Sequence, residues 1–219
     1  MLDKTALARL IDHALLAPDL TDRQLLSGLA LARETGCFAA CVHATDVATA
    51  SRVLAGSKTG VCAVVGFPLG RQTTLLKAKE AEEAFKKGAF ELDMVLHIGH
   101  LKSGRHQELQ EDIQTVASAT PAPLKVILET CYLNTEEKIT ACKIAMAAGA
   151  KFVKTSTGFG PGGATTEDIV LLRKTVGENF GVKAAGGIAT LKDLHQMIKA
   201  GANRIGTSKT AAILQGSGF

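Results

Sequence analysis

The sequence Lys151-Phe152-Val153-Lys154-Thr155-Ser156-Thr157-Gly158-Phe159-Gly160 contains the clearest signal in the chain. Its apolar and β-branched residues favour a short strand over residues 151–156, and its glycines favour a turn directly afterwards. Because strand side chains alternate between two faces, Lys154 faces away from Val153 and Thr155. The stretch alone fits either a lysine at a reaction site or an ordinary edge-strand lysine that reaches solvent.

Seven further short apolar segments resemble this strand in length and composition. We expect strands at residues 11–16, 38–42, 60–66, 91–96, 124–129, 182–187 and 204–208. We expect helices at residues 4–9, 21–34, 45–54, 74–87, 102–117, 134–149 and 191–199, and another that begins at residue 165.

This alternation of strands and helices predicts an α/β fold. Eight strands with short connections and no linker favour one (β/α)8 TIM barrel, a single domain over residues 1–219. A doubly wound open sheet is the alternative, because alternation alone does not distinguish a closed sheet from an open one. Eight strands in a chain of this length favour closure.

Composition and charge argue against a nucleic-acid partner. The chain has no tryptophan, one tyrosine and a formal net charge of +4, and its lysines are spread along the predicted helices. A nucleic-acid surface needs a concentrated basic patch or aromatic stacking platforms, and neither is visible.

The cysteines indicate a reducing compartment. Cys37, Cys41, Cys62, Cys131 and Cys142 form no C-x-x-C pair, so we expect neither a zinc cage nor a disulfide framework. The six histidines have no metal-ligand spacing either, and no metal is expected. No secretory core or membrane-length apolar run is visible. We therefore expect a soluble, cytoplasmic protein without a membrane partner.

Charged residues interrupt four of the expected strands in the same way. Asp93, Lys125, Lys154 and Lys183 each lie between neighbours that can face the helices, which points the charge into the barrel. Buried lysines need partners or shifted pKa values, so this arrangement suits a reaction site better than a stable interior. For Asp93 and Lys125, an interior salt bridge is the alternative.

The pair of lysines on consecutive strands suggests imine chemistry. Lys154 and Lys183 are expected to be neighbours, so each disfavours the positive charge of the other, and an unprotonated amine is a nucleophile. An imine formed with a carbonyl compound would be followed by proton transfers at the adjacent carbon. Asp93 is the natural carrier of those protons, directly or through water.

Two glycine turns provide a candidate phosphate site. Gly186 and Gly187 follow the seventh expected strand, and Gly206 and Ser208 lie at the end of the eighth. Barrels often bind phosphate with these two loops, through backbone N–H groups and hydroxyls. Ordinary turns are the alternative.

A glycine pattern typical of dinucleotide binding is a false lead. Gly158, Gly160 and Gly163 fit G-x-G-x-x-G, but Glu178 precedes the next strand instead of ending it, and the strand before the glycines contains Lys154. We therefore expect no nicotinamide cofactor.

Several motifs together resemble deoxyribose-phosphate aldolases, a family of class I aldolases. The resemblance covers nearly the whole chain and rests on residues 11–13, 65–70, 91–95, 125–130, 152–159 and 182–188. It implies reversible cleavage of 2-deoxy-D-ribose 5-phosphate into D-glyceraldehyde 3-phosphate and acetaldehyde. It also implies that Lys154 forms the Schiff base, Lys183 disfavours the charge of Lys154, and Asp93 donates and accepts protons.

The same resemblance implies a substrate-binding set and a quaternary structure. The set comprises Asp12, Cys41, Lys125, Thr155, Thr157, Gly158, Gly186, Gly187, Gly206 and Ser208. From its apolar strand alone, Cys41 is a core residue rather than a nucleophile. No cofactor is implied because the imine itself accepts electrons, and a homodimer is expected.

The chain departs from the family pattern at four positions. Ala14 and His97 replace a usual threonine and asparagine, and Lys209 follows Ser208 where another serine is usual. Phe219 stands where some members have a tyrosine that helps proton transfer, which suggests a slower enzyme. Two other functions remain open: a phosphosugar isomerase with Asp93 as base, and a non-catalytic barrel that senses a phosphorylated metabolite.

Overall fold

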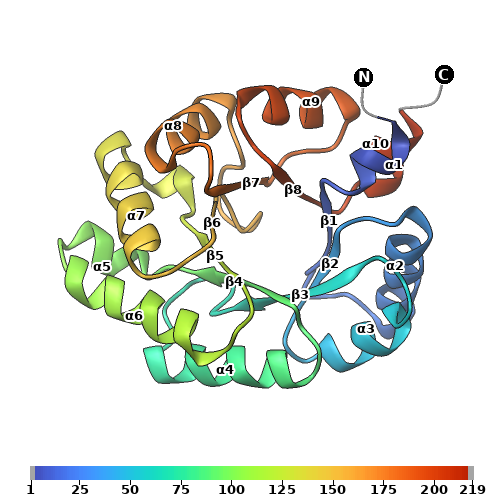
Figure 1. Ribbon diagram of the computed structural model, residues 1–219, viewed down its shortest axis with the longest axis horizontal. Helices are drawn as coiled ribbons and strands as arrows, with labels where there is room; N and C mark the ends of the chain where they lie inside the picture. Colours follow the sequence, from blue (N-terminus) through green and yellow to red (C-terminus); the bar gives the residue numbers. More distant parts are fainter. Residues whose placement is uncertain (1–2, 217–219) are drawn as a thin grey trace.

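The computed structural model describes residues 3–216, and its eight strands form one closed parallel barrel in sequence order. Figure 1 shows the helices as a ring around these strands. The strands are β1 (Ile11–Leu15), β2 (Ala39–Val42), β3 (Gly60–Val65), β4 (Glu91–Val95), β5 (Leu124–Ile127), β6 (Phe152–Lys154), β7 (Gly181–Ala185) and β8 (Arg204–Thr207). Pairing of β1 with β8 closes the sheet, which confirms the predicted TIM barrel and excludes the open-sheet alternative.

The outer ring consists of ten α-helices and one short 3₁₀ helix within the described part of the chain. They are α1 (Lys4–Ala8), α2 (Asp22–Thr35), α3 (Val47–Leu54), α4 (Thr74–Lys86), α5 (Ile98–Lys102), α6 (His106–Ala119), η1 (Thr130–Tyr132), α7 (Thr135–Ala147), α8 (Thr166–Val176), α9 (Leu191–Ala200) and α10 (Thr210–Gln215). The two helices nearest the chain ends, α1 and α10, lie side by side (Figure 1).

Helix ends follow local sequence signals. Thr21 and Gln24 form a capping box at the start of α2, and Gly36 ends that helix in the left-handed conformation. Asn134 caps α7 in the same manner with Glu137. These boundaries agree with the sequence analysis to within two residues.

The helix predicted over residues 102–117 is present as α6 but begins four residues late, at His106, and a short unpredicted helix, α5, precedes it. Residues 103–105 separate the two helices. Gly104 has a φ of +70°, a left-handed conformation that interrupts a right-handed helix. Helix α10 was not predicted, and β5 and β6 end two residues earlier than expected, at Ile127 and Lys154.

Alternation along the strands separates the apolar core from the barrel interior. Leu92, Met94, Val126, Val153 and Val182 belong to the large core between strands and helices. Their neighbours in sequence, the four charged residues singled out above, point the other way and are buried inside the barrel. The predicted inward direction of these charges is confirmed.

Across residues 3–216, no helix has both the length and the apolar character needed to cross a bilayer. Phe219, the expected replacement for a terminal tyrosine, lies outside the described residues.

Candidate active site

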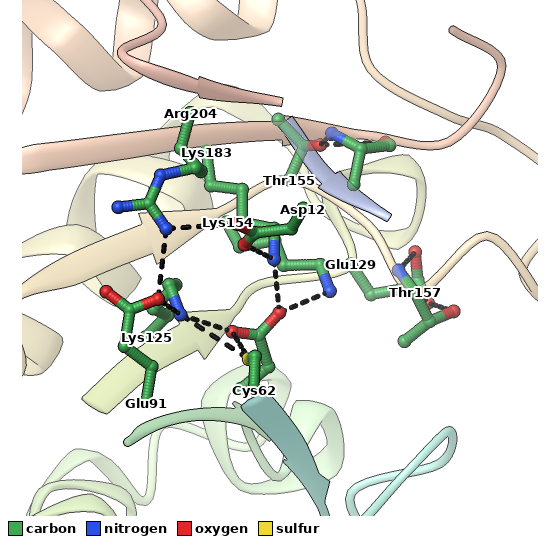
Figure 2. Close-up of polar contacts among 12 residues, drawn as sticks. Asp12, Cys62, Glu91, Lys125, Glu129, Lys154, Thr155, Thr157, Lys183 and Arg204 are labelled. Atoms are coloured by element: carbon green, nitrogen blue, oxygen red, sulfur yellow. Dashed lines mark hydrogen bonds and ion pairs between the residues drawn. The ribbon is translucent and has the colours of Figure 1, made fainter. Parts of the chain in front are cut away.

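Three lysines converge on Asp93 in the barrel interior. Figure 2 shows the side chains of Lys125, Lys154 and Lys183 gathered there. Lys154 Nζ and Lys183 Nζ donate to the same carboxylate oxygen, Oδ2, at 2.7 and 2.8 Å. Lys125 Nζ lies 3.0 Å from the other oxygen, Oδ1. Strand register explains the convergence, because Lys125 lies opposite Asp93 on β4 and β5, and Lys183 lies opposite Lys154 on β6 and β7.

A second layer of ion pairs lies beneath this group. Lys183 also donates to Asp12, and Lys125 lies 2.6 Å from Glu91 Oε2. Arg204 joins these two carboxylates, at 3.0 Å from Asp12 Oδ1 and 2.9 Å from Glu91 Oε2. We call all seven residues the charged cluster: Asp12, Glu91, Asp93, Lys125, Lys154, Lys183 and Arg204.

Sequence reasoning missed Glu91 and Arg204. Glu91 lies two residues before Asp93, and Arg204 two residues before Gly206, so strand alternation places both side chains inside the barrel. The guanidinium carbon of Arg204 also lies 3.4 Å from the ring centroid of Phe38. A stricter use of the two-residue period would have found these residues.

The pairing fixes most charges of the cluster. Burial raises the pKa of Asp93, but Lys125, Lys154 and Lys183 outweigh it and hold that pKa well below its usual range. For Asp12, burial is likewise outweighed, chiefly by Lys183, and the pKa is lowered. Both carboxyl groups are therefore ionised at neutral pH.

The expectation that neighbouring lysines suppress each other's charge is wrong for Lys183. Burial lowers the pKa of Lys183, but the carboxylates of Asp12 and Asp93 dominate and hold it well above its usual value. The pKa of Lys125 is raised in the same way, with Asp93 as the main opponent of burial. Both side chains are therefore ammonium ions.

A cavity of about 600 Å³ opens above the charged cluster at the carboxyl ends of the strands. Most of the predicted site residues line it: Asp12, Cys41, Lys154, Thr157, Gly158, Lys183, Gly186, Gly187, Gly206 and Ser208. Reaction sites of TIM barrels occupy this end. The cavity therefore joins the predicted lysines to the predicted phosphate turns.

Three predicted residues are not among the described residues that line the cavity: Asp93, Lys125 and Thr155. Lys125 is fully buried and engaged by two carboxylates. Thr155 Oγ1 donates to the carbonyl of Ala185 and accepts from its N–H, at 3.0 and 3.1 Å. These contacts fit residues that support the cavity floor and do not fit direct substrate contacts by Lys125 and Thr155.

The glycine turns need their small residues. Gly186 has a φ of +88°, and an added Cβ would lie 2.9 Å from Gly163 Cα. A Cβ on Gly206 would lie 3.1 Å from Lys183 Cε, so glycine leaves room for the lysine stem. Gly187 has no atom within 4 Å of its Cβ position, which leaves its backbone accessible.

Two thiols adjoin Asp93. Cys41 lies opposite Cys62 on β2 and β3, and the Cys62 thiol donates to Asp93 Oδ1 at 3.1 Å. The ligand atoms of these three residues lie within 4.8 Å of one another. A cation there would compete with the three ammonium groups on Asp93, so we assign no metal to this group.

Glu129 is a buried carboxylate that sequence reasoning included in a strand. It has a φ of +53°, rare for a residue other than glycine, asparagine or aspartate. Its carboxylate accepts from the N–H and the hydroxyl of Thr157, and Thr157 Oγ1 accepts from Phe159 N–H at 3.0 Å. Glu129 thus fixes the loop that forms one wall of the cavity.

The positions that depart from the family pattern have different surroundings. Ala14 and Lys209 line the cavity. His97 does not; it caps α5, where its Nδ1 accepts from His100 N–H at 3.1 Å, and its ring stacks on that of His100.

Comparisons with known proteins agree with this geometry. A model of DeoC/LacD family aldolases matches residues 6–217. A deoxyribose-phosphate aldolase of Caldanaerobacter subterraneus is 52% identical over 213 residues, which cover 95% of this chain and 92% of that protein. One of Listeria welshimeri is 50% identical over 212 residues, 96% of this chain and 95% of that protein.

Solved structures are similar over nearly the whole chain. One aldolase superposes with a TM-score of 0.93 at 41% identity and covers 98% of this chain and 96% of its own. The deoxyribose phosphate aldolase of Aeropyrum pernix gives a TM-score of 0.89 at 29% identity, covering 97% and 91%. From the family match and these relatives, together with the barrel and its lysines, the chain belongs to the DeoC/LacD family of aldolases.

Proposed function

We propose that the protein catalyses the reversible aldol cleavage of 2-deoxy-D-ribose 5-phosphate to D-glyceraldehyde 3-phosphate and acetaldehyde through an imine on Lys154. The observation that carries this proposal is the position of Lys154, at the floor of the cavity and bonded to Asp93. The names of the relatives, at 50 and 52% identity, supply the substrate.

Lys154 is the cation of the charged cluster with the fewest carboxylate partners. Three carboxylates face four cations, and each of the other three cations contacts two carboxylates. Lys154 contacts one, and shares its oxygen with Lys183. The Lys154 amine can therefore turn from its carboxylate to a substrate carbonyl with the smallest loss of pairing in the cluster.

The reaction follows from a nucleophilic amine at this position. The amine adds to the aldehyde carbon C1, water leaves, and a protonated imine forms. Removal of the C3 hydroxyl proton then breaks the C2–C3 bond, whose electron pair moves into the imine to give an enamine as D-glyceraldehyde 3-phosphate leaves. Protonation of C2 and hydrolysis release acetaldehyde and restore the amine.

Asp93 and Lys183 support these steps. Asp93 accepts a hydrogen bond from Lys154 Nζ at 2.7 Å, and it is the proposed carrier of protons, directly or through water. Its low pKa makes it a weak base while Lys125 and Lys183 pair with it, which favours a water in the relay. Lys183 stays protonated and keeps Asp93 oriented.

The two glycine turns are the proposed phosphate site. Gly186, Gly187 and Gly206 offer backbone N–H groups, and Ser208 offers a hydroxyl on the same side of the cavity. Thr157 and Gly158 line the cavity on the loop that follows β6 and are proposed to contact the sugar chain. Asp12, Lys125 and Thr155 are assigned to support, because their polar atoms are already bonded within the protein.

Incubation with 2-deoxy-D-ribose 5-phosphate tests the proposal. We expect acetaldehyde and D-glyceraldehyde 3-phosphate in equal amounts from the parent protein and neither from Lys154→Met. An isomerase would change the sugar without breaking its carbon chain, and a sensor would bind the sugar without turnover. Either result would overturn the aldolase assignment.

We further propose a cytoplasmic homodimer. The described cysteines are all free, which fits a reducing compartment. The Aeropyrum pernix relative is described as tetrameric, so the dimer needs a direct test. Light scattering coupled to gel filtration should give twice the mass of the chain, and a fourfold mass would contradict the proposal.

A further inference from the structure

Lys209 is a charged residue of the cavity that the proposed mechanism does not use. Its side chain is exposed, and it lines the same cavity as Ser208 and the glycine turns. No ion pair or side-chain hydrogen bond of Lys209 occurs within residues 3–216. Its ammonium group is therefore available to a ligand.

The other charged residues that line the cavity are already paired within the protein. Asp12 and Lys183 bond to each other, and Lys154 bonds to Asp93. Asp12 is the only carboxylate among the described lining residues, and it is fully buried at the floor. An anion near Lys209 would thus meet one free cation and no exposed carboxylate of the lining.

The backbone holds Lys209 beside the glycine turn that follows β7. Lys209 N–H donates to Thr207 Oγ1 at 2.9 Å, and that hydroxyl donates to the carbonyl of Ile188 at 2.7 Å. Ile188 directly follows Gly187. One threonine therefore ties the Lys209 backbone to the turn proposed to bind phosphate.

Strand register places Lys209 toward the open end of the cavity. Gly206 lies opposite Asp12 on β1 and Ala185 on β7, at the level of the charged cluster. Lys209 is three residues further along the chain, and Gly187 is two residues beyond Ala185. Both groups therefore lie past the lysines, where the far end of an open-chain sugar attached to Lys154 would reach.

Resting on the proposed function, we propose that Lys209 is a specificity-determining residue that binds the substrate phosphate with its ammonium group. Backbone N–H groups and the Ser208 hydroxyl are neutral donors, whereas Lys209 adds a full charge that a phosphate dianion meets and an unphosphorylated sugar does not. The charge of Lys209 would therefore favour the phosphorylated sugar over the unphosphorylated one.

The test compares two sugars on three proteins. For Lys209→Met, we expect kcat/KM with 2-deoxy-D-ribose 5-phosphate to fall about tenfold, mainly through a higher KM. The loss is moderate because Lys209 is exposed, so solvent weakens its pairing with the phosphate. The kcat/KM with unphosphorylated 2-deoxy-D-ribose should stay within about twofold. Lys209→Arg keeps the charge and should retain most of the activity. Raising the salt concentration should reduce the parent's preference for the phosphorylated sugar more than that of Lys209→Met.

A matched control removes a different charge. Lys199 is exposed in the last turn of α9 and does not line the cavity, so Lys199→Met lowers the net charge equally. It should leave both kcat/KM values unchanged. Equal falls for the two sugars, or no fall for Lys209→Met, would overturn the inference while leaving the aldolase activity in place.

Binding of inorganic phosphate separates this inference from the proposed function. If the parent protein cleaved neither sugar, the proposed function would be wrong, and calorimetric titration with phosphate would still test Lys209. Weaker binding of phosphate by Lys209→Met than by Lys199→Met supports the inference. Equal binding by the two variants contradicts it.

Discussion

Lys154 and Lys183 lie directly opposite each other on β6 and β7, and both donate to Oδ2 of Asp93. They are distinguished by their other partners: Lys183 also pairs with Asp12, whereas Asp93 is the one carboxylate that Lys154 contacts in the described chain. Lys183 is thereby held as an ammonium ion, and Lys154, with one carboxylate partner, is the proposed nucleophile.

Removal of the Lys154 amine should abolish turnover and spare the fold. Lys154→Met keeps the stem that packs in the barrel and removes the nucleophile. We expect kcat to fall at least about a thousandfold, because no imine can form. Thermal unfolding should still be cooperative, and activity near the parent level would refute the assignment of the nucleophile.

Neutralising Asp93 should cost both activity and stability. In Asp93→Asn, three buried lysines lose the carboxylate that they share. We expect a loss of about 3–5 kcal/mol in the free energy of unfolding, measured with urea. Adding Lys125→Met should recover part of that loss, because one lysine that lacks its carboxylate is then removed. If the losses of the two single variants simply added in the double variant, Asp93 and Lys125 would not be coupled.

Lys77 offers a contrasting lysine with a structural role. It is fully buried on α4, where Nζ lies 2.7 Å from Asp112 Oδ2, and it does not line the cavity. Lys77→Met leaves Asp112 buried without its cation, and we expect a loss of about 3–5 kcal/mol in stability.

At temperatures where Lys77→Met is folded, its kcat/KM should equal that of the parent. Combining it with Asp112→Asn should restore stability in part, because the uncompensated carboxylate is gone. A lower kcat/KM for fully folded Lys77→Met would contradict a purely structural role of the Lys77–Asp112 pair.

His13 should make stability depend on pH. It is buried on β1, with Nδ1 2.8 Å from Thr210 Oγ1, and burial lowers its pKa from 6.5 to about 4. The unfolded chain takes up the proton below about pH 6.5, and the folded protein only near pH 4. The free energy of unfolding should therefore fall by about 3 kcal/mol as pH drops across this window.

His13→Asn removes the titrating ring and keeps polar atoms near Thr210. Its stability should fall much less over the same pH range, with a remaining slope from His97 and His100, whose pKa values burial also lowers. His195→Asn, at an exposed position on α9, should follow the parent. The low pKa of the Asp12 and Asp93 carboxyls contributes stability that is lost as pH falls below their usual pKa of 3.8, at the acid end of this window and beyond. Identical slopes for parent and His13→Asn would contradict the prediction.

The alternation of strand side chains between two faces allowed the candidate site to be predicted from the sequence. Asp93, Lys125, Lys154 and Lys183 each have neighbours that face the helices, so their inward direction follows from strand geometry alone. Closure of the barrel then brings them together. The count of strands predicted that closure.

The sequence does not predict which of the inward-facing charges pair with one another. The link from Arg204 to Glu91 spans 113 positions and exists only because the ring closes across its interior. The left-handed backbone of Glu129 was missed for a different reason. An apolar segment that ends in an acidic residue predicts a strand that continues to that residue, not a left-handed turn. The break at Gly104 shows the same limit for helices, because the helical pattern continues through it.

The most direct test of the account is peptide mapping after incubation with acetaldehyde and borohydride. Reduction should leave an ethyl group on Lys154, and because trypsin does not cleave well after an alkylated lysine, the modified peptide should run from residue 152 to Arg173. An adduct on that peptide in the parent, and none in Lys154→Met, is the predicted result. An adduct on Lys183, or none on a folded protein, would contradict the central claim.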